Sequence, residues 1–393
     1  MSKKQDRSKR KKRLTIAIVS PGTFSVPPVV GSSVEHDIEM VANELRQKHR
    51  VIVYTRRCKE YPRSSRIGTL EYRRVAYDHW RSYLRKVVRD LKTLKPDIIQ
   101  VENRPKYIHK IRAKFPDTPI VLNMHSMQFA SKPHIAPDKV EKALGNIDAL
   151  LTNSHYLKQE YVRRFPLASK KTYAVHLGID TTPFERSGHK KRALRKLRKK
   201  YGLKRNDAVL LFAGRLKKEK GVHHLLRALP ALLKKRPNVK LLIAGSPKYG
   251  NNKPTAYAKK IYKMAQGLKH HVVFTDFIKP HEMPRIYQLA DIVVTPSVWG
   301  EPFCRVNLEA MASALPVVTT RRGGIPEVVK DGHHGYVLPL KGLSKTLPRT
   351  LIKLLQSKKK RKTFGENAYQ AAKTFTWQKT ADQYASVYAS LLE

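Results

Sequence analysis

Short apolar runs alternate with longer amphipathic segments along most of this chain. The apolar runs are rich in Val and Ile and do not alternate with polar residues, which is typical of strands buried on both faces of a parallel sheet. In the first half, the predicted strands are residues 14–20, 51–55, 97–103, 119–125 and 171–180. The predicted crossover helices between them include residues 34–48, 83–94 and 107–115. This half is therefore predicted to be a doubly wound α/β unit.

The same alternation starts again near residue 208. Predicted strands cover residues 208–216, 239–246, 271–278, 291–297, 315–320 and 335–339. A helix between the first two carries one apolar stripe, formed by Leu225, Leu226, Leu229, Leu232 and Leu233. Two Rossmann-like parallel-sheet domains in tandem imply a cleft between them. The chain shows no fixed repeat of 20 to 50 residues, which argues against a solenoid.

Four segments follow from these patterns. Residues 1–13 form a basic arm, residues 14–185 the first domain and residues 186–374 the second domain. Residues 375–393 form a terminal helix with an apolar stripe at Trp377, Ala381, Tyr384, Val387 and Leu391.

Length and composition fit a globular protein with two cores. The chain has 393 residues, of which 41% are hydrophobic, and no window approaches 18 consecutive apolar residues. The basic start is followed by only seven mostly apolar residues before Pro21, which is too short for a secretion signal. The two cysteines, Cys58 and Cys304, lie far apart and lack metal-ligand spacing. We therefore expect a cytoplasmic protein without a transmembrane segment or disulfides.

The net charge of +50 is the most unusual bulk property. It indicates attraction to polyanions or to a negative surface and says nothing about the fold. Basic residues concentrate in residues 1–13, in residues 186–205, which hold 11 basic residues and no acid, and in residues 358–362. Solvated faces explain such runs as well as binding does. Aromatic residues are nearly absent from the first two runs, so any nucleic-acid binding is expected to be nonspecific.

Ligands of open parallel sheets bind beyond the carboxyl ends of the strands, so catalytic and binding residues are expected there. After the first strand, Gly31 precedes Ser32 and Ser33 at a predicted helix start, where free N–H groups can hold an anion. A simple serine N-cap explains these residues equally well. His125 follows the strand at 119–125, at a position that should face the cleft, although a lone histidine is often structural.

Two cations follow the first strand of the second domain. Arg215 comes directly after this strand and Lys220 just before the next helix. Together they could neutralise a diphosphate, although a chain this basic places cations after strands by chance.

Two glutamates, Glu301 and Glu309, lie eight residues apart in an apolar neighbourhood, on what is predicted to be the first three turns of one helix. On a single helix they would be separated by roughly 12 Å along the axis and about 80° around it. That spacing suits two parts of one elongated ligand better than the paired carboxylates of a glycoside hydrolase. The alternative is structural: a helix-dipole interaction for Glu301 and an ion pair between Glu309 and Arg305.

These residues belong to motifs that resemble those of a known family. The segment from Gly300 to Leu338, with two glutamates separated by seven residues and a later Gly-Gly-x-x-Glu, resembles retaining nucleotide-sugar glycosyltransferases of family 4, which have the GT-B fold. Residues 213–229 resemble the family's diphosphate-binding motif. The resemblance covers nearly the whole chain after the basic arm. Within the family, the sequence is most similar to the spore-coat-associated glycosyltransferases of Bacillus-type bacteria. This likeness is carried by residues 103–110, 279–294 and 301–312.

The resemblance implies a role for each candidate residue. Glu301 would lie beside the donor sugar and Glu309 would bind the ribose, while His125 would touch the sugar from the first domain. Arg215 and Lys220 would bind the diphosphate, assisted by the backbone N–H groups of Phe303 and Cys304, and Gly31 would approach it closely. In the family, the terminal helix crosses back to the first domain. The chain departs from the common pattern at Ser32, where a second glycine is usual, and at Pro302 to Arg305, where Gly-Phe-Gly-Leu is usual.

Fixed cations and helix-start donors would stabilise a departing diphosphate electrostatically. The sequence has no Asp-x-Asp pair, so no metal or other cofactor is expected. We therefore expect a retaining, metal-independent glycosyltransferase that moves a sugar from a nucleotide donor, with UDP favoured, to a glycan, lipid or protein acceptor of the cell envelope or spore coat. The alternative is a structural coat protein on the same scaffold, held to the spore coat or another acidic surface by its charge.

Overall fold

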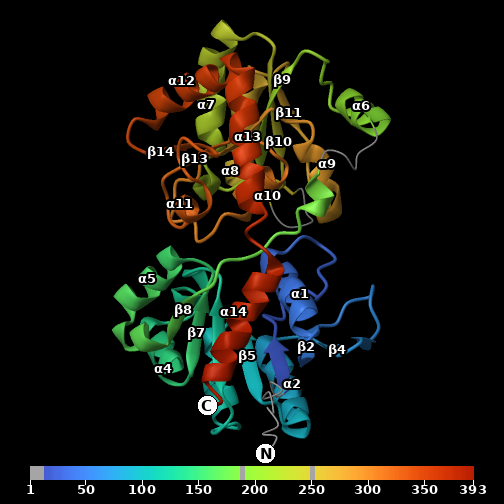
Figure 1. The fold of residues 1–393 in the computed structure, drawn as a ribbon, viewed down its shortest axis with the longest axis vertical. Coiled ribbons are helices and arrows are strands. Elements are labelled where there is room, and N and C mark those ends of the chain that lie inside the picture. Colours follow the sequence, from blue (N-terminus) through green and yellow to red (C-terminus); the bar gives the residue numbers. More distant parts are fainter. Residues whose placement is uncertain (1–12, 186–190, 248–252) are drawn as a thin grey trace, which may run out of the picture.

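Two sheets, each covered by helices, are stacked along the long axis of the molecule (Figure 1). The computed structural model describes residues 13–185, 191–247 and 253–393. Within these residues, all strand pairs in both sheets are parallel except one, β3 (Ser64–Ile67) with β4 (Leu70–Val75). The prediction of two parallel-sheet α/β domains is therefore confirmed. The basic arm up to residue 12 and residues 186–190 of the basic segment lie outside the described residues.

The first sheet has eight strands in the order β3-β4-β2-β1-β5-β6-β7-β8. Its other strands are β1 (Thr15–Val19), β2 (Arg50–Arg56), β5 (Ile98–Glu102), β6 (Ile120–Met124), β7 (Ala149–Thr152) and β8 (Thr172–Ala174). Its helices are α1 (Ser33–Leu45), α2 (Trp80–Leu94), α3 (Pro105–Arg112), α4 (Pro137–Gly145) and α5 (His155–Arg164). Short 3-10 turns are η1 (Gln128–Ala130), η2 (Pro166–Lys171) and η3 (Thr182–Phe184).

The second sheet has six strands in the order β11-β10-β9-β12-β13-β14. These strands are β9 (Ala208–Ala213), β10 (Val239–Ala244), β11 (Val272–Phe274), β12 (Ile292–Thr295), β13 (Val317–Thr320) and β14 (Gly335–Leu338). The helices are α6 (Lys191–Lys200), α7 (Val222–Lys235), α8 (Ala256–Gln266), α9 (Met283–Tyr287), α10 (Arg305–Ala312), α11 (Ile325–Val328), α12 (Leu343–Gln356) and α13 (Lys358–Ala372). Two 3-10 turns are η5 (Lys218–Lys220) and η6 (Pro280–Glu282).

The strands could be predicted from apolar runs because most of their residues are buried. Every residue of β5 and β6 is buried, as expected for strands with helices on both sides. The edge pair β3 and β4 was not predicted, because β3 is short, polar and mostly exposed and so carries no hydrophobic signal. None of the helices in the described residues has the length and apolar character needed to cross a membrane.

The terminal helix α14 (Trp377–Ser390) runs from the second domain onto the first (Figure 1). It packs on α1, and one buried cluster contains side chains from both sheets together with Trp377 and Tyr384. Gly178 approaches the start of α14 so closely that a Cβ there would lie 2.3 Å from the backbone nitrogen of Trp377. Thr380 Oγ1 also donates a hydrogen bond to the carbonyl oxygen of His176 at 2.9 Å. The helix thus ties the two domains together beside the space between them.

Candidate active site

A cavity of about 1200 Å³ lies between the two sheets, at the carboxyl ends of their strands. All eight residues singled out from the sequence line it: Gly31, His125, Arg215, Lys220, Glu301, Phe303, Cys304 and Glu309. Strand order reverses between β1 and β5 in the first sheet and between β9 and β12 in the second. Gly31 follows β1, Lys220 follows β9 and Glu301 follows β12, so the cavity joins both topological switch points, where α/β sheets bind their ligands.

Lys220 and Glu301 form an ion pair in the wall of this cavity. Lys220 Nζ donates to the two carboxylate oxygens of Glu301 at 2.7 and 2.8 Å. Ser297 Oγ and Trp299 Nε1 donate to the same carboxylate at 3.1 and 2.9 Å. Burial alone would lower the pKa of Lys220, but the Glu301 carboxylate raises it above its ordinary value. Lys220 is therefore charged at neutral pH, and Glu301 is held in one orientation by three donor groups.

The expectation that Glu301 lies on the same helix as Glu309 is wrong. The helix α10 begins at Arg305, so Glu301 belongs to the loop that follows β12. Pro302 lies in this loop, and the N-cap residue Cys304 adopts a left-handed conformation with φ of +60°, which interrupts helical backbone. The helical separation expected for the two carboxylates therefore does not apply, and the orientation of Glu301 is fixed by its donors instead.

The loop before α10 presents backbone donors. The Phe303 ring is buried against His176 and Phe375, which anchors the loop. Neither the Phe303 nor the Cys304 N–H has a hydrogen-bond acceptor among the residues described. Such free donors at a helix start attract anions. Burial, together with nearby Glu301, raises the pKa of the Cys304 thiol to about 12, so this thiol is neutral at physiological pH.

The remaining donor-site candidates lie around this loop. Arg215 lines the cavity, and its charge acts to lower the pKa of Lys220, so the two cations are neighbours. Gly31 faces the second domain: a Cβ at this position would lie 3.2 Å from Pro280 Cγ. Ser32 occupies the N-cap of α1 but makes no side-chain cap, and its hydroxyl donates to Glu35 instead.

Glu309 on α10 accepts a hydrogen bond from Tyr287 Oη at 2.7 Å. Burial raises the pKa of Glu309, and the positive charge of Arg305 opposes this effect. The alternative in which Glu309 forms an ion pair with Arg305 is not what the structure shows, since Arg305 forms its ion pair with Asp37 in the first domain. Glu309 therefore keeps capacity to accept a further hydrogen bond from a ligand.

A chain of four charged side chains crosses the boundary between the domains. Arg305 Nη1 contacts Asp37 Oδ1 at 2.7 Å, and Asp37 Oδ2 lies 3.4 Å from His125 Nδ1. His125 Nε2 in turn lies 3.0 Å from Glu102 Oε2. Asp37 and Glu102 are buried to 3% and 1% exposure. Sequence reasoning missed both acids, since an acid on an amphipathic helix or at a strand end ordinarily faces solvent.

His125 holds its proton because of this chain. Burial alone would lower the pKa of His125, but hydrogen bonds to Asp37 and Glu102 raise it to about 10. Both ring nitrogens are already engaged, so the ring lines the cavity as a fixed cation without a free polar atom for a ligand. A direct contact between His125 and a sugar would require one of these bonds to be exchanged.

The raised pKa predicts a stability change at high pH. A histidine whose pKa is about 10 when folded and near 6.5 when unfolded stabilises the protein fully below pH 6.5 and loses this contribution as pH rises to 10. Urea denaturation at pH 6.5 and 9.5 should show that wild type loses more than about 1 kcal/mol relative to His125→Gln over this interval. The variant corrects for the many lysines that titrate in the same range. Equal losses in both proteins would mean that His125 is neutral in the folded state.

A second interdomain contact involves Glu327 of α11, the acid of the Gly-Gly-x-x-Glu stretch. Its carboxylate accepts from the backbone N–H groups of His155 and Tyr156 at 2.8 and 2.7 Å, at the start of α5, and contacts His176 Nε2 at 2.7 Å. Burial would raise the pKa of Glu327, but these donors lower it. Gly324 allows the approach, since a Cβ there would lie 3.0 Å from the Ser154 side chain.

Potential metal ligands gather at one place in the described residues. One ligand atom each of His155, His176 and Glu327 lies within 4.8 Å of the others. Both oxygens of Glu327 already accept backbone N–H bonds there, and none of the three residues lines the cavity. These residues could take a metal ion only by giving up part of that contact.

Comparisons with known proteins match both domains. The family model described as "Glycosyl transferases group 1" matches residues 194–371, and that described as "Glycosyltransferase Family 4" matches residues 34–183. The chain is 33% identical over 383 residues to spore coat protein SA of Bacillus subtilis, covering 95% of this chain and 99% of that protein. It is 27% identical to the lipopolysaccharide 1,2-N-acetylglucosaminetransferase of Salmonella typhimurium, covering 92% of this chain and 94% of that enzyme.

The fold also matches solved structures. The structure of Anabaena HepE in complex with UDP-glucose superimposes with a TM-score of 0.76 at 21% identity, covering 96% of this chain and 100% of that chain. At this identity the likeness concerns the fold. The match extends over both domains and not over one Rossmann unit alone.

Proposed function

Since the chain belongs to the group 1, family 4 glycosyltransferases and has their GT-B fold, we propose that it transfers a sugar, with retention of configuration and without a metal, from a UDP-sugar to an acceptor of the cell envelope or spore coat. The observation that carries the proposal is the cavity at both switch points, which gathers Lys220, Glu301 and Glu309. A nucleotide sugar is elongated and anionic at its centre. The cavity offers separate carboxylates with cations and free N–H groups beside them.

Different residues of the cavity would bind different parts of the donor. Lys220, Arg215 and the N–H groups of Phe303 and Cys304 would hold the diphosphate and stabilise its charge as it departs, which is electrostatic catalysis. Glu301 would hold the sugar and Glu309 the ribose. When a diphosphate enters, Lys220 would share its charge between Glu301 and the phosphate.

The choice of UDP rests on HepE, a protein of the same fold whose structures contain UDP and UDP-glucose. The spore-coat acceptor rests on the name of spore coat protein SA. The proposal of retention rests on the family resemblance alone. Metal independence is supported by the cations around the diphosphate position. Anomeric analysis of the product by NMR and turnover in the presence of EDTA test these two points.

Binding of UDP tests the proposed donor site directly. We expect UDP to bind in calorimetric titrations more tightly than GDP or ADP. Glu309→Gln should weaken UDP binding about tenfold, because a charged acceptor for a ribose hydroxyl is lost. Glu366→Gln, an exposed glutamate on α13, is the matched control and should leave binding unchanged. If none of the three nucleotides bound, the structural coat role would replace the proposal.

A further inference from the structure

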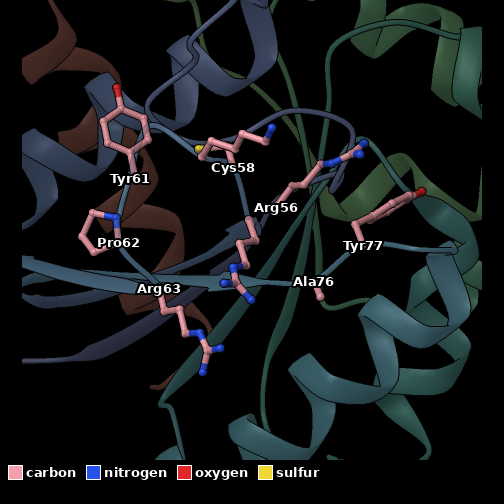
Figure 2. A pocket seen from close by; sticks show the side chains of 9 residues that line it. Arg56, Cys58, Tyr61, Pro62, Arg63, Ala76 and Tyr77 are labelled. Carbon is pink, nitrogen blue, oxygen red and sulfur yellow. The ribbon is translucent and has the colours of Figure 1, made fainter.

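A second pocket, of about 540 Å³, lies at the carboxyl ends of β2 and β4 in the first domain. Arg56 ends β2, and the loop 57–63 forms most of the wall. Figure 2 shows Tyr61 and Pro62 on one side of this pocket and Tyr77 on the other. Tyr61 also lines the large cavity, so the two spaces are adjacent. The pocket therefore opens beside the proposed active site, on the first-domain side.

The pocket is lined by four cations and by no acid: Arg56, Arg57, Lys59 and Arg63. In the part of the chain that the structure describes, none of these four side chains takes part in an ion pair. Glu60, which interrupts this basic run in the sequence, lines the large cavity instead. The lining of the pocket therefore carries four positive charges and no negative one.

Underneath, Arg74 fixes the shape of the loop. Its side chain is only 6% exposed, and its Nη1 donates to the carbonyl oxygen of Pro62 at 3.2 Å. The backbone N–H of Arg57 donates to Val75 O at 2.9 Å, and that of Arg74 donates to Arg63 O at 2.8 Å. The loop is thus pinned at both ends to β4. The backbone of the loop that carries these cations is therefore fixed by hydrogen bonds to β4.

A multivalent anion can neutralise several cations that line one pocket. Arginine forks match the oxygens of phosphate in particular. We propose that this basic pocket binds a phosphate group carried by the acceptor, which places a phosphorylated acceptor beside the donor cavity. The inference rests on the proposed function, because it names the chemistry of the acceptor for that site. The concave shape suits one phosphorylated group better than a flat anionic membrane.

The test compares two double variants with equal charge. Arg57→Gln with Arg63→Gln removes two cations of the pocket, and Arg85→Gln with Arg89→Gln removes two exposed cations of α2. Each protein is saturated with UDP to occupy the donor cavity and then titrated with inorganic pyrophosphate by calorimetry. We expect a second site in wild type and in the α2 variant, and binding at least about tenfold weaker in the pocket variant.

Three results would overturn the inference. The first is the absence of a second site in wild type, and the second is equal weakening in both double variants, which would reflect net charge alone. The third is loss of binding to phosphatidylglycerol vesicles in the pocket variant while pyrophosphate and glucose 6-phosphate bind normally, which would indicate a membrane surface. UDP binding should be the same in all three proteins. Failure of wild type to bind UDP would contradict the proposed function alone, and the titration without UDP would still compare the two variants.

Discussion

Replacing Lys220 with alanine is expected to lower turnover about 100-fold or more and the free energy of unfolding by about 3 kcal/mol. The two effects have different causes. Turnover falls because a cation is lost where the proposed diphosphate departs. Stability falls because Glu301, only 6% exposed, is left as a buried carboxylate without its counter-ion. Ser297 and Trp299 continue to donate to Glu301 but carry no charge.

A double substitution separates these effects. Lys220→Met with Glu301→Gln removes both charges, so the unfolding free energy should return to within about 1 kcal/mol of wild type, because a buried ion pair contributes little net stability. Turnover should remain as low as in the single variants. Lys217→Ala is the control, since Lys217 pairs with Glu219 in the same loop at 3.4 Å but both side chains are over a third exposed. Recovery of turnover by the double variant would mean that Lys220 and Glu301 stabilise the fold and take no part in catalysis.

The alternation of apolar and amphipathic segments was sufficient to predict both sheets, because burial on two faces leaves an unmistakable composition in strands such as β5 and β10. It was also sufficient to locate the cavity, since the candidate residues were chosen at strand ends and strand ends meet at one edge. The edge strand β3 escaped prediction because it is exposed and polar. The pattern of apolar residues reflects how deeply each residue is buried, and the residues of β3 are mostly exposed.

Partners across the domain boundary could not be predicted in the same way. Arg305 and Asp37 are separated by 268 positions, and no local pattern encodes their contact. The same holds for Glu327, whose partners are backbone N–H groups of α5. The late start of α10 at Arg305 is not evident from the sequence, because Cys304 adopts a left-handed conformation that a glycine would have signalled. Charge pairing and backbone strain are thus the two features that the sequence conceals here.

Replacing Asp37 with asparagine is expected to cost about 2 to 3 kcal/mol of unfolding free energy and to reduce kcat/KM more than tenfold. Asp37 is 3% exposed and accepts from Arg305 of the second domain while holding the His125 ring from the first. Without its charge, two buried or half-buried cations face each other, and the pKa of His125 should fall. Asp37 acts through these neighbours and is therefore a positioning residue.

The role in positioning predicts a coupling that a simple loss of stability would not show. In a double-mutant cycle of Asp37→Asn and Arg305→Gln, we expect a coupling of about 1 to 3 kcal/mol, and the UDP-bound radius of gyration in small-angle scattering should increase in each variant. Asp382→Asn is the control, because its ion pair with Lys48 joins the turn after α1 to α14 but is exposed and should contribute under about 1 kcal/mol. If the effects of the two substitutions on the unfolding free energy were additive and the radius of gyration were unchanged, Asp37 would stabilise only the first domain. Coupling with a larger radius would instead show that this pair maintains the domain contact, so that the Glu309 carboxylate of α10 reaches the donor only when the chain from Arg305 to Glu102 is intact.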